Sequence, residues 1–338
     1  MRTVQSALDA LAQDVDPYLV NATDPWKRVV NYPPIWLALA QTLRFKNELY
    51  YLGFEISMVL GYLTACLLLL KKYPSIWLLA ILLSGSSLLA VERGNNDILI
   101  FSLLYIAALL PAISGTLILL ISIVLKLYPI FAVPFLSRNK LLMVLAVLIS
   151  VGYFIGVQTE IQKITAKMDL SPTLSYGLLN IVVWFAWHLK MPVSMGLIVL
   201  TLLLGAGAVL LYLLPKRLAI QKVQDSTHES TLFVMGAGIF LGTFLTASNW
   251  DYRLLFLSLC VPYLVKLELT TFKTVILASM IIATNQCYLE GKIDQLAINL
   301  CIAAKCIVFV SLAALFLLEL VHRLAGRWVP KITAPSHR

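Results

Sequence analysis

Charged residues are scarce in this chain. Only 13% of its 338 residues are Asp, Glu, Lys or Arg, whereas 60% are hydrophobic; average soluble domains carry about 25% charged residues. No stretch of domain length is polar enough to form a separate soluble domain. This composition excludes an ordinary soluble enzyme and predicts a protein that crosses a membrane several times.

The motifs of common metal and nucleotide enzymes are also missing. The sequence contains no HExxH, no nucleotide-binding glycine loop and no Ser-His-Asp arrangement, and its four histidines are scattered. Five cysteines lie in or beside apolar runs without a CxxC pair, which is typical of small buried side chains. We therefore expect no metal and no cofactor. The cysteines are Cys66, Cys260, Cys287, Cys301 and Cys306.

Basic residues outnumber acidic ones by 26 to 17. A net charge of +9 could indicate nucleic acid, but many of these residues occupy short loops between apolar runs, as membrane topology requires. We therefore expect no nucleic-acid partner. If the loops are cytoplasmic, the protein lies in the plasma (inner) membrane with a cytoplasmic C-terminus. They hold Lys71 and Lys72; Arg138 and Lys140; Lys216, Arg217 and Lys222; Lys266 and Lys273; and Arg323, Arg327, Lys331 and Arg338.

The apolar runs predict an all-α transmembrane bundle of about 8 to 10 spans, since about 20 apolar residues cross a bilayer. We expect one membrane domain over 1–338, with an extracytoplasmic segment at 1–34, the bundle at 35–322 and a cytoplasmic tail at 323–338. Ile35–Leu43 and Gly177–Trp187 are short enough to lie at the interface. The predicted longer or returning runs are 49–70, 75–91, 98–110, 112–125, 129–136, 141–157, 192–214, 232–248, 254–267, 272–288 and 295–320.

The remaining polar segments then fall on the outer face. They are the N-terminal segment, Glu92–Asp97, the polar loop Gln158–Tyr176, Asn249–Arg253 and Asn285–Asp294. Polar residues beside lipid are costly and usually functional. Their convergence on one face predicts a binding site there.

Glu92–Asp97 (Glu-Arg-Gly-Asn-Asn-Asp) is the most informative segment. Carboxylates there could orient or deprotonate a hydroxyl, a guanidinium could bind phosphate bidentately, and amides could bind sugar hydroxyls. The alternative is a turn that joins two helices, with an internal Glu–Arg pair. Asn249–Arg253 offers the same chemistry, its alternative being a snorkelling arginine within an aromatic belt.

Two lysines border or enter apolar runs. Lys126 follows a predicted span, where it could bind a phosphate oxygen or snorkel to water. Lys305 lies about ten residues into the last predicted span, with no acidic residue three or four positions away. A phosphate or a carboxylate from another helix must therefore meet Lys305.

These motifs, in this order, resemble a known family. Asp-Pro-Tyr (16–18) and Tyr-Pro-Pro (32–34) precede Glu92–Asp97, Lys-x-Tyr-Pro-x-x-x-x-Pro (126–134) and Asn-Trp-Asp-Tyr-Arg (249–253). From about Asp14 to Pro262 the chain is similar to the C-type (GT-C) integral membrane glycosyltransferases, nearest to the family 87 polyprenol-phosphate-mannose-dependent mannosyltransferases.

The resemblance implies inverting transfer of a hexose, by expectation mannose, from a polyprenyl-phosphate donor to a lipid or glycan acceptor on the extracytoplasmic face. The donor phosphate would be bound by Arg93, Lys126 and Arg253, and the sugar by Asn95, Asn96 and Asp97. The remaining expected substrate-binding residues are Tyr32, Glu92, Asn249, Asp251 and Tyr252.

The family's catalytic base lies after a first helix that would precede Met1. We therefore expect either a truncated chain, with the base upstream, or a base at Asp16 or Asp9. Two alternatives stay open: a flippase or transporter of lipid-linked sugars, and an inactive relative that assists a partner.

Overall fold

The computed structural model describes residues 2–24, 27–166, 175–189, 192, 198, 201–210, 227–246, 249–286 and 295–325. The first half contains α1 (Arg2–Leu11), α2 (Ile35–Thr42), α3 (Glu48–Lys72), α4 (Ile76–Leu82), α5 (Gly85–Glu92), α6 (Asp97–Leu109), α7 (Ala112–Leu125) and the 3₁₀ helix η1 (Tyr128–Arg138). The second half contains α8 (Lys140–Gly156), α9 (Gln158–Ala166), β1 (Ser175–Tyr176), α10 (Leu178–Leu189), α12 (Thr227–Thr246), β2 (Asn249–Trp250), the 3₁₀ helix η2 (Asp251–Cys260), α13 (Val261–Val265), α14 (Thr270–Thr284) and α16 (Gln295–Ala325).

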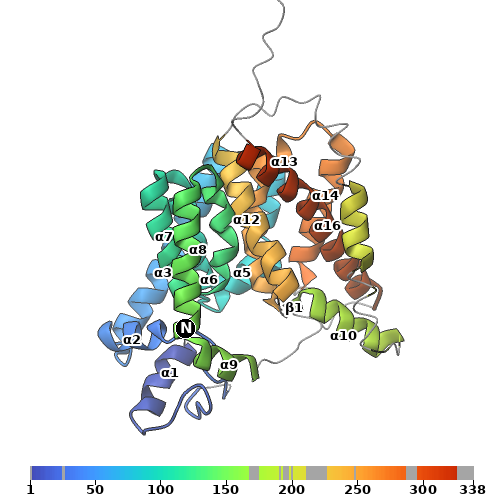
Figure 1. The fold of residues 1–338 in the computed structure, drawn as a ribbon. Coiled ribbons are helices and arrows are strands. Elements are labelled where there is room, and N and C mark those ends of the chain that lie inside the picture. The colour runs from blue at the N-terminus through green and yellow to red at the C-terminus, as the bar shows by residue number, and fades with distance from the viewer. Residues whose placement is uncertain are drawn as a thin grey trace, which may run out of the picture.

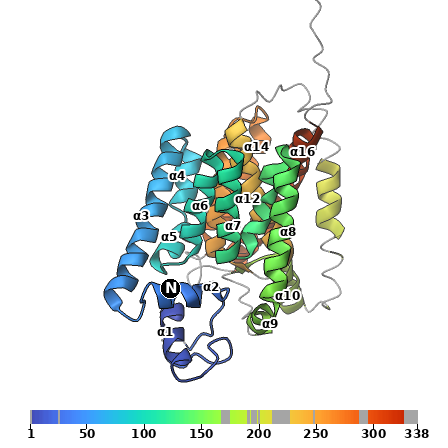
Figure 2. The ribbon, with the colours of Figure 1, turned by 60° about the vertical axis from the view of Figure 1, so that its left-hand side comes forward.

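The predicted all-α class is confirmed, because within the described ranges the sole sheet consists of two-residue strands. Helix α12 lies in the middle of the bundle (Figure 1), and 78% of its apolar window is buried. Helix α3 forms one edge (Figure 2) and exposes large apolar side chains such as Leu60 and Leu67. An apolar exposed face of this kind suits contact with lipid.

Three described helices, α3, α12 and α16, are long and apolar enough to cross a membrane, or four if the bent pair α8–α9 counts as one span. This is compatible with a membrane protein. The count is below the predicted 8 to 10, because several apolar runs form shorter helices of 10–17 residues. Of the predicted span 192–214, only residues 192, 198 and 201–210 are described, and 201–210 are helical.

The predicted span 75–91 is not one continuous helix. It ends as α4 at Leu82 and restarts as α5 at Gly85, whose backbone N–H donates to Asn285 Oδ1 at 3.0 Å. A side-chain acceptor of this kind satisfies one of the free N–H groups at a helix start. Pro129 and Pro134 lie within η1, where missing N–H donors disfavour α-helix and leave a 3₁₀ segment.

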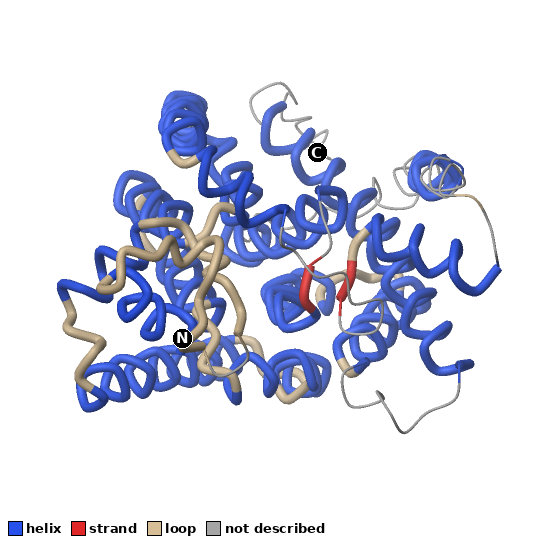
Figure 3. Tube along the Cα trace, turned by 90° about the horizontal axis from the view of Figure 1, so that it is seen from below, coloured by secondary structure: helices blue, strands red, loops and turns tan. Residues whose placement is uncertain are grey.

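The N-terminal segment, α9 and the two strands gather at one end of the bundle (Figure 1); seen from that end, the N-terminal loops lie over the ends of several helices (Figure 3). The prediction of a polar loop over Gln158–Tyr176 is wrong for its first half, because residues 158–166 form the helix α9. Ile161 and Ile164 are three positions apart, which places them on the same face of that helix. β1 pairs antiparallel with β2, which brings residues 175–176 to 249–250.

Two glycines let η1 approach α12 closely. Gly238 and Gly242 are four residues apart and therefore lie on the same face of α12. A Cβ atom on Gly238 would lie 2.2 Å from the backbone oxygen of Phe131 in η1. Small residues at this spacing are a common means of close helix packing in membranes.

We expect Gly238→Ala to lower the free energy of unfolding by about 1–3 kcal/mol, because the η1 backbone must move to admit the methyl group. Gly152→Ala in α8 is the matched control, since a Cβ there meets nothing within 4 Å. It should be neutral or stabilising by about 0.5–1 kcal/mol. Unfolding by SDS in mixed micelles would measure both; equal effects would contradict the close contact.

Candidate functional site

The segment Glu92–Asp97 is a helix-to-helix turn with caps at both ends. Gly94 ends α5 in a left-handed conformation (φ +51°), and the N–H groups of Gly94 and Asn95 donate to the carbonyls of Val91 and Ala90. This is the Schellman pattern, which favours glycine. Asn95 Oδ1 then accepts from the N–H of Asp97 at 3.0 Å, at the start of α6. The turn reading of this segment is therefore correct, and the turn also positions its polar side chains.

Lys126 binds the side chains of this turn. The residue follows α7 in an extended conformation, and its Nζ donates to Asn95 Oδ1 (3.3 Å), Asn96 Oδ1 (2.6 Å) and Asp97 Oδ1 (2.5 Å). Only 7% of the Lys126 side chain and none of the Asp97 side chain is exposed. Three acceptors match the three donor hydrogens of an ammonium group. Lys126 is therefore held by the protein and does not snorkel to water.

A second cation faces the same carboxylate. Arg253 Nε lies 3.7 Å from Asp97 Oδ2, and its guanidinium lies 5.0 Å from the centre of the Tyr128 ring. Tyr128 Oη donates to Asp97 Oδ1 at 2.6 Å. Asp97 thus supplies one negative charge to two positive ones, which leaves an excess of one positive charge. We call these residues, with Asn95 and Asn96, the Lys126 cluster.

Two donors of the Lys126 cluster have no hydrogen-bond acceptor among the described residues. They are Arg253 Nε and Asn96 Nδ2, and both are buried; Asp97 Oδ2, 3.7 Å from Arg253 Nε, is a buried acceptor without a hydrogen-bond donor within the described ranges. A buried donor without a partner costs about 1–3 kcal/mol unless water or a ligand accepts from it. The excess charge and the unmet donors together suit an anion.

Tyrosines surround the ammonium group of Lys126. It lies 5.3 Å from the ring centre of Tyr32, 5.8 Å from that of Tyr128 and 6.0 Å from that of Tyr252. Cations are attracted to aromatic faces at such distances. Burial raises the pKa of Tyr32 above its ordinary value, so its phenol stays neutral. The N-terminal segment, which carries Tyr32, therefore contributes one wall of the cluster.

Lys305 forms a second buried cluster beside the strands. Its Nζ donates to Asp251 Oδ1 (2.8 Å), Gln286 Oε1 (2.6 Å) and the backbone oxygen of Ser175 (3.2 Å). The side chains of Lys305 and Asp251 are 3% and 0% exposed. The sequence predicted that a phosphate or a carboxylate from another helix meets Lys305. The carboxylate of Asp251 does so. We call this group the Lys305 cluster; its lysine and carboxylate charges balance.

The segment 249–253 connects the two clusters. Asn249 donates to the backbone oxygen of Thr243 and accepts from Arg253 Nη1, while Asp251 lies between them in sequence and binds Lys305. The Thr243 hydroxyl also bonds to Tyr176 of β1 at 2.7 Å. The five-residue motif therefore supplies one charged residue to each cluster.

Not every predicted residue lies in these clusters. The structure brings together Tyr32, Asn95, Asn96, Asp97, Lys126, Tyr252 and Arg253, with Asn249 and Asp251 alongside. Glu92 and Arg93 are exposed at the end of α5 instead. They occupy the last turn and C-cap of that helix, just before the buried residues Asn95, Asn96 and Asp97.

The two expected catalytic acids lie in the N-terminal segment. Asp9 is half exposed and 3.8 Å from Lys46, whereas Asp16 Oδ2 accepts from Lys163 of α9 at 2.6 Å. Burial alone would raise the pKa of Asp16, but the hydrogen bonds from Lys163 and from the Tyr18 backbone lower it below its ordinary 3.8. The hydrogen bond to Asp16 in turn raises the pKa of Lys163. A base role for either acid stays a prediction.

The Asp16–Lys163 pair should make the attachment of α9 depend on pH. The pKa of Asp16 is lower in the folded state than in the unfolded state. The pair therefore contributes its full stabilisation above the pKa of the unfolded state, and this contribution is lost as the pH falls through the pKa of the folded state. We expect α9 to exchange its amide hydrogens faster at about pH 3 than at about pH 5, after correction for the intrinsic rate. Lys163→Met should remove that difference; an unchanged difference would contradict the pair's role.

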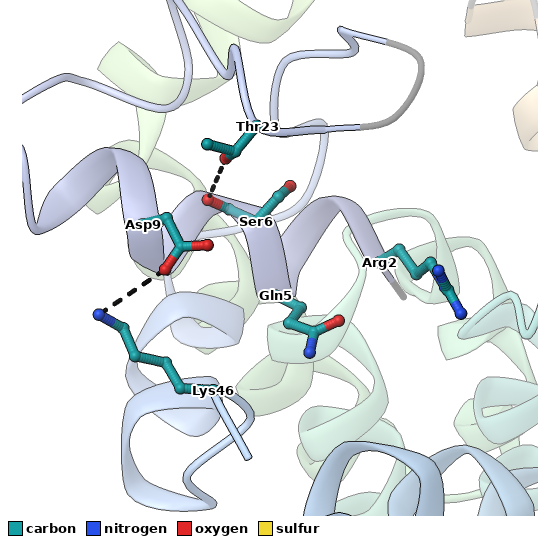
Figure 4. Close-up of a pocket in the computed structure, with 6 residues that line it drawn as sticks. All are labelled: Arg2, Gln5, Ser6, Asp9, Thr23 and Lys46. Carbon is teal, nitrogen blue, oxygen red and sulfur yellow. Dashed lines mark hydrogen bonds and ion pairs between the residues drawn. The ribbon is translucent and has the colours of Figure 1, made fainter. Parts of the chain in front are cut away.

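A cavity among the described residues lies away from both clusters. It measures about 180 Å³, lies in the N-terminal segment and is shown in Figure 4; Arg2, Gln5, Ser6, Asp9, Thr23 and Lys46 line it. A water-sized cavity of about 10 Å³ adjoins Lys305. The Lys305 cluster therefore leaves little free volume beside its lysine. Within the described ranges, no three His, Cys, Asp or Glu side chains are placed to hold a metal ion.

The sequence prediction missed several residues of the clusters. Tyr128 belongs to the Lys-x-Tyr-Pro motif, two positions after Lys126. This motif could have identified Tyr128 as a candidate site residue. Ser175 and Gln286 lie within the predicted outer polar segments Gln158–Tyr176 and Asn285–Asp294, but nothing in the sequence singled out these two residues. Only the packing of α14, α16 and β1 brings them to Lys305.

The fold and the clusters define a helical protein, with helices long enough to span a membrane, that buries an anion-compatible ionic site at one end of its bundle. No known family, curated protein or solved structure matches the chain.

Proposed function

We propose that the protein is an integral membrane glycosyltransferase that moves a hexose from a polyprenyl-phosphate donor to a lipid or glycan hydroxyl. The hexose that we expect is mannose. The observation that supports this function best is the Lys126 cluster, with its excess positive charge and its two unmet buried donors. A phosphodiester would supply the missing negative charge and the missing acceptors.

In this proposal Arg253 binds the donor phosphate directly. Lys126 already has three acceptors, so it supplies charge and holds Asn95, Asn96 and Asp97 in place. Arg253 keeps unused N–H groups, and 19% of its side chain is exposed. A base removes the acceptor proton as the acceptor oxygen attacks the anomeric carbon, and the polyprenyl phosphate leaves. Protein–phosphate contacts that strengthen as this leaving group gains charge would accelerate the step.

The chemistry also suits the position of the cluster. A polyprenyl chain needs an apolar surface, which the exposed side chains of α3, α7 and α8 provide. The sugar and its acceptor need water-facing polar groups, which the N-terminal segment provides. The proposed active face is extracytoplasmic.

The test is sugar transfer in lipid nanodiscs from a radiolabelled short-chain polyprenyl-phosphate mannose to a panel of lipid and glycan acceptors. Arg253→Gln should lower the rate about 100-fold, the usual effect of losing one donor to a developing anion. Arg138→Gln, at an exposed arginine that ends η1, is the matched control and should stay within about twofold of the wild type. Absence of transfer to any acceptor, with donor binding also absent, would overturn the proposal.

A third buried cluster, around Arg323, favours one alternative, a transporter of lipid-linked sugars. Near the other end of α16, Arg323 Nε donates to Glu319 Oε1 and to Ser230 Oγ, both at 3.0 Å, with side chains 0% and 7% exposed for Arg323 and Glu319. Lys305 and Arg323 are 18 positions apart, or about 27 Å along a helix. A transport path would need polar groups at both ends.

Cysteine labelling separates the two functions. A cysteine at Arg253 that reacts with a membrane-impermeant reagent from one side only supports the transferase. Reaction from both sides, with the donor changing which side is favoured, supports the transporter.

A further inference from the structure

The cavity in the N-terminal segment has a different chemistry from the Lys126 cluster. All six side chains that line it are polar or charged, and none is apolar (Figure 4). An acyl chain would therefore find no surface to bury there. At about 30 Å³ per liquid water molecule, a volume of about 180 Å³ corresponds to roughly six waters. This is room for a single small polar unit.

The charges around the cavity balance. Arg2 and Lys46 are positive, Asp9 is negative, and Glu48 accepts from Gln5 at 3.0 Å and lies 4.0 Å from Arg2. Among the described residues at the cavity, two positive and two negative charges leave none in excess, in contrast to the Lys126 cluster. An anion would gain little from such a balanced site. A neutral ligand with many hydroxyl groups would find both donors and acceptors.

The pairs at this cavity are also weak. Lys46 and Asp9 are 3.8 Å apart and 57% and 52% exposed, and the Arg2–Glu48 pair is longer still. Exposed pairs of this kind contribute about 0–1 kcal/mol. Their side chains can therefore turn to a ligand at little cost. Ser6 and Thr23, by contrast, are fixed by hydrogen bonds to Thr3, Asn21 and the Ser6 carbonyl.

The cavity belongs to the same structural unit as one wall of the Lys126 cluster. Tyr18 Oη donates to the backbone oxygen of Tyr32 at 3.0 Å, and the Tyr32 ring faces Lys126. A ligand in the cavity would thus lie in the segment that packs against the cluster, at the same end of the bundle.

We propose that this cavity binds one uncharged saccharide unit, with Asp9 accepting from its hydroxyls and Gln5, Arg2 and Lys46 donating to them. That the saccharide is part of the acceptor rests on the proposed function; its binding does not.

Saturation-transfer NMR on the full chain in nanodiscs, with methyl α-D-mannoside as the probe, tests this site. We expect a dissociation constant of about 1 mM, and a loss of affinity of about tenfold in Asp9→Asn and in Gln5→Ala. Asp14→Asn and Gln13→Ala are matched controls, because each makes the same chemical change at an exposed position of the same segment that does not line the cavity. Both controls should bind like the wild type.

Binding of inorganic phosphate tests the alternative that the cavity is an anion site. If Asp9→Asn raised the affinity for phosphate and left that for the mannoside unchanged, the cavity would be an anion site and the proposal would be wrong. Equal losses in Asp9→Asn and Asp14→Asn would also overturn it. The measurement uses no donor, so a protein that binds the mannoside but transfers no sugar would overturn the proposed function and leave this site standing.

Discussion

Asp97→Asn is expected to lower the free energy of unfolding by about 3–5 kcal/mol, the usual result of removing one partner from a buried ion group. The substitution keeps the shape of the side chain but leaves Lys126 and Arg253 as two buried positive charges without a carboxylate between them. Like charges at such proximity repel strongly away from water. Unfolding by SDS in mixed micelles would measure the loss.

Lys126→Met should destabilise the protein less, by about 1–3 kcal/mol. Asp97 would still accept from Tyr128 and face Arg253, so its charge stays compensated. Asp14→Asn, at an exposed aspartate, removes the same charge and should change stability by less than about 0.5 kcal/mol. Equal effects of Asp97→Asn and Lys126→Met would contradict the assignment of one carboxylate to two cations.

Lys305→Met is expected to destabilise the protein about as much as Asp97→Asn does, by about 3–5 kcal/mol. The buried carboxylate of Asp251 would lose the ammonium group of Lys305. Here the double substitution is informative. Lys305→Met with Asp251→Leu removes a balanced pair and replaces it with apolar side chains of similar size, a change that is often neutral in other proteins. We expect the double variant to recover most of the stability.

The corresponding double variant of the Lys126 cluster, Lys126→Met with Asp97→Leu, should not recover, because Arg253 remains buried without a carboxylate. The coupling energy from each double-mutant cycle would measure this contrast. Recovery in both clusters, or in neither, would show that the charge balance derived from the structure is wrong.

Local chemistry decided much of the candidate site before any tertiary contact was known. Gly94, two asparagines and an aspartate between apolar runs allowed a turn between helices as the alternative interpretation, and the structure has such a turn. The depth of Lys305 in an apolar run required a buried negative partner, and Asp251 is that partner. Both predictions follow from near-neighbour rules: αL caps favour glycine, and a buried charge needs a counter-charge.

Other features depended on contacts between distant segments. The break between α4 and α5 is supported by Asn285, two hundred positions away from Gly85. Glu92 and Arg93 are exposed although Asn95, Asn96 and Asp97, which follow them closely, are buried. The cavity at Asp9 exists because α1 packs near the turn that carries Lys46. No local pattern specifies such pairings, since many segments could supply an amide or a lysine.

The sequence by itself determined the helical class, the apolar helices, the capped turn and the set of polar residues from which a site could be built, because composition, periodicity and caps act over a few residues. The tertiary structure alone decided that Asp97 lies between Lys126 and Arg253, that Asp251 belongs to Lys305, and that the N-terminal segment closes over the first cluster through Tyr32. The physical reason is that a buried charge requires a partner, but packing chooses which one.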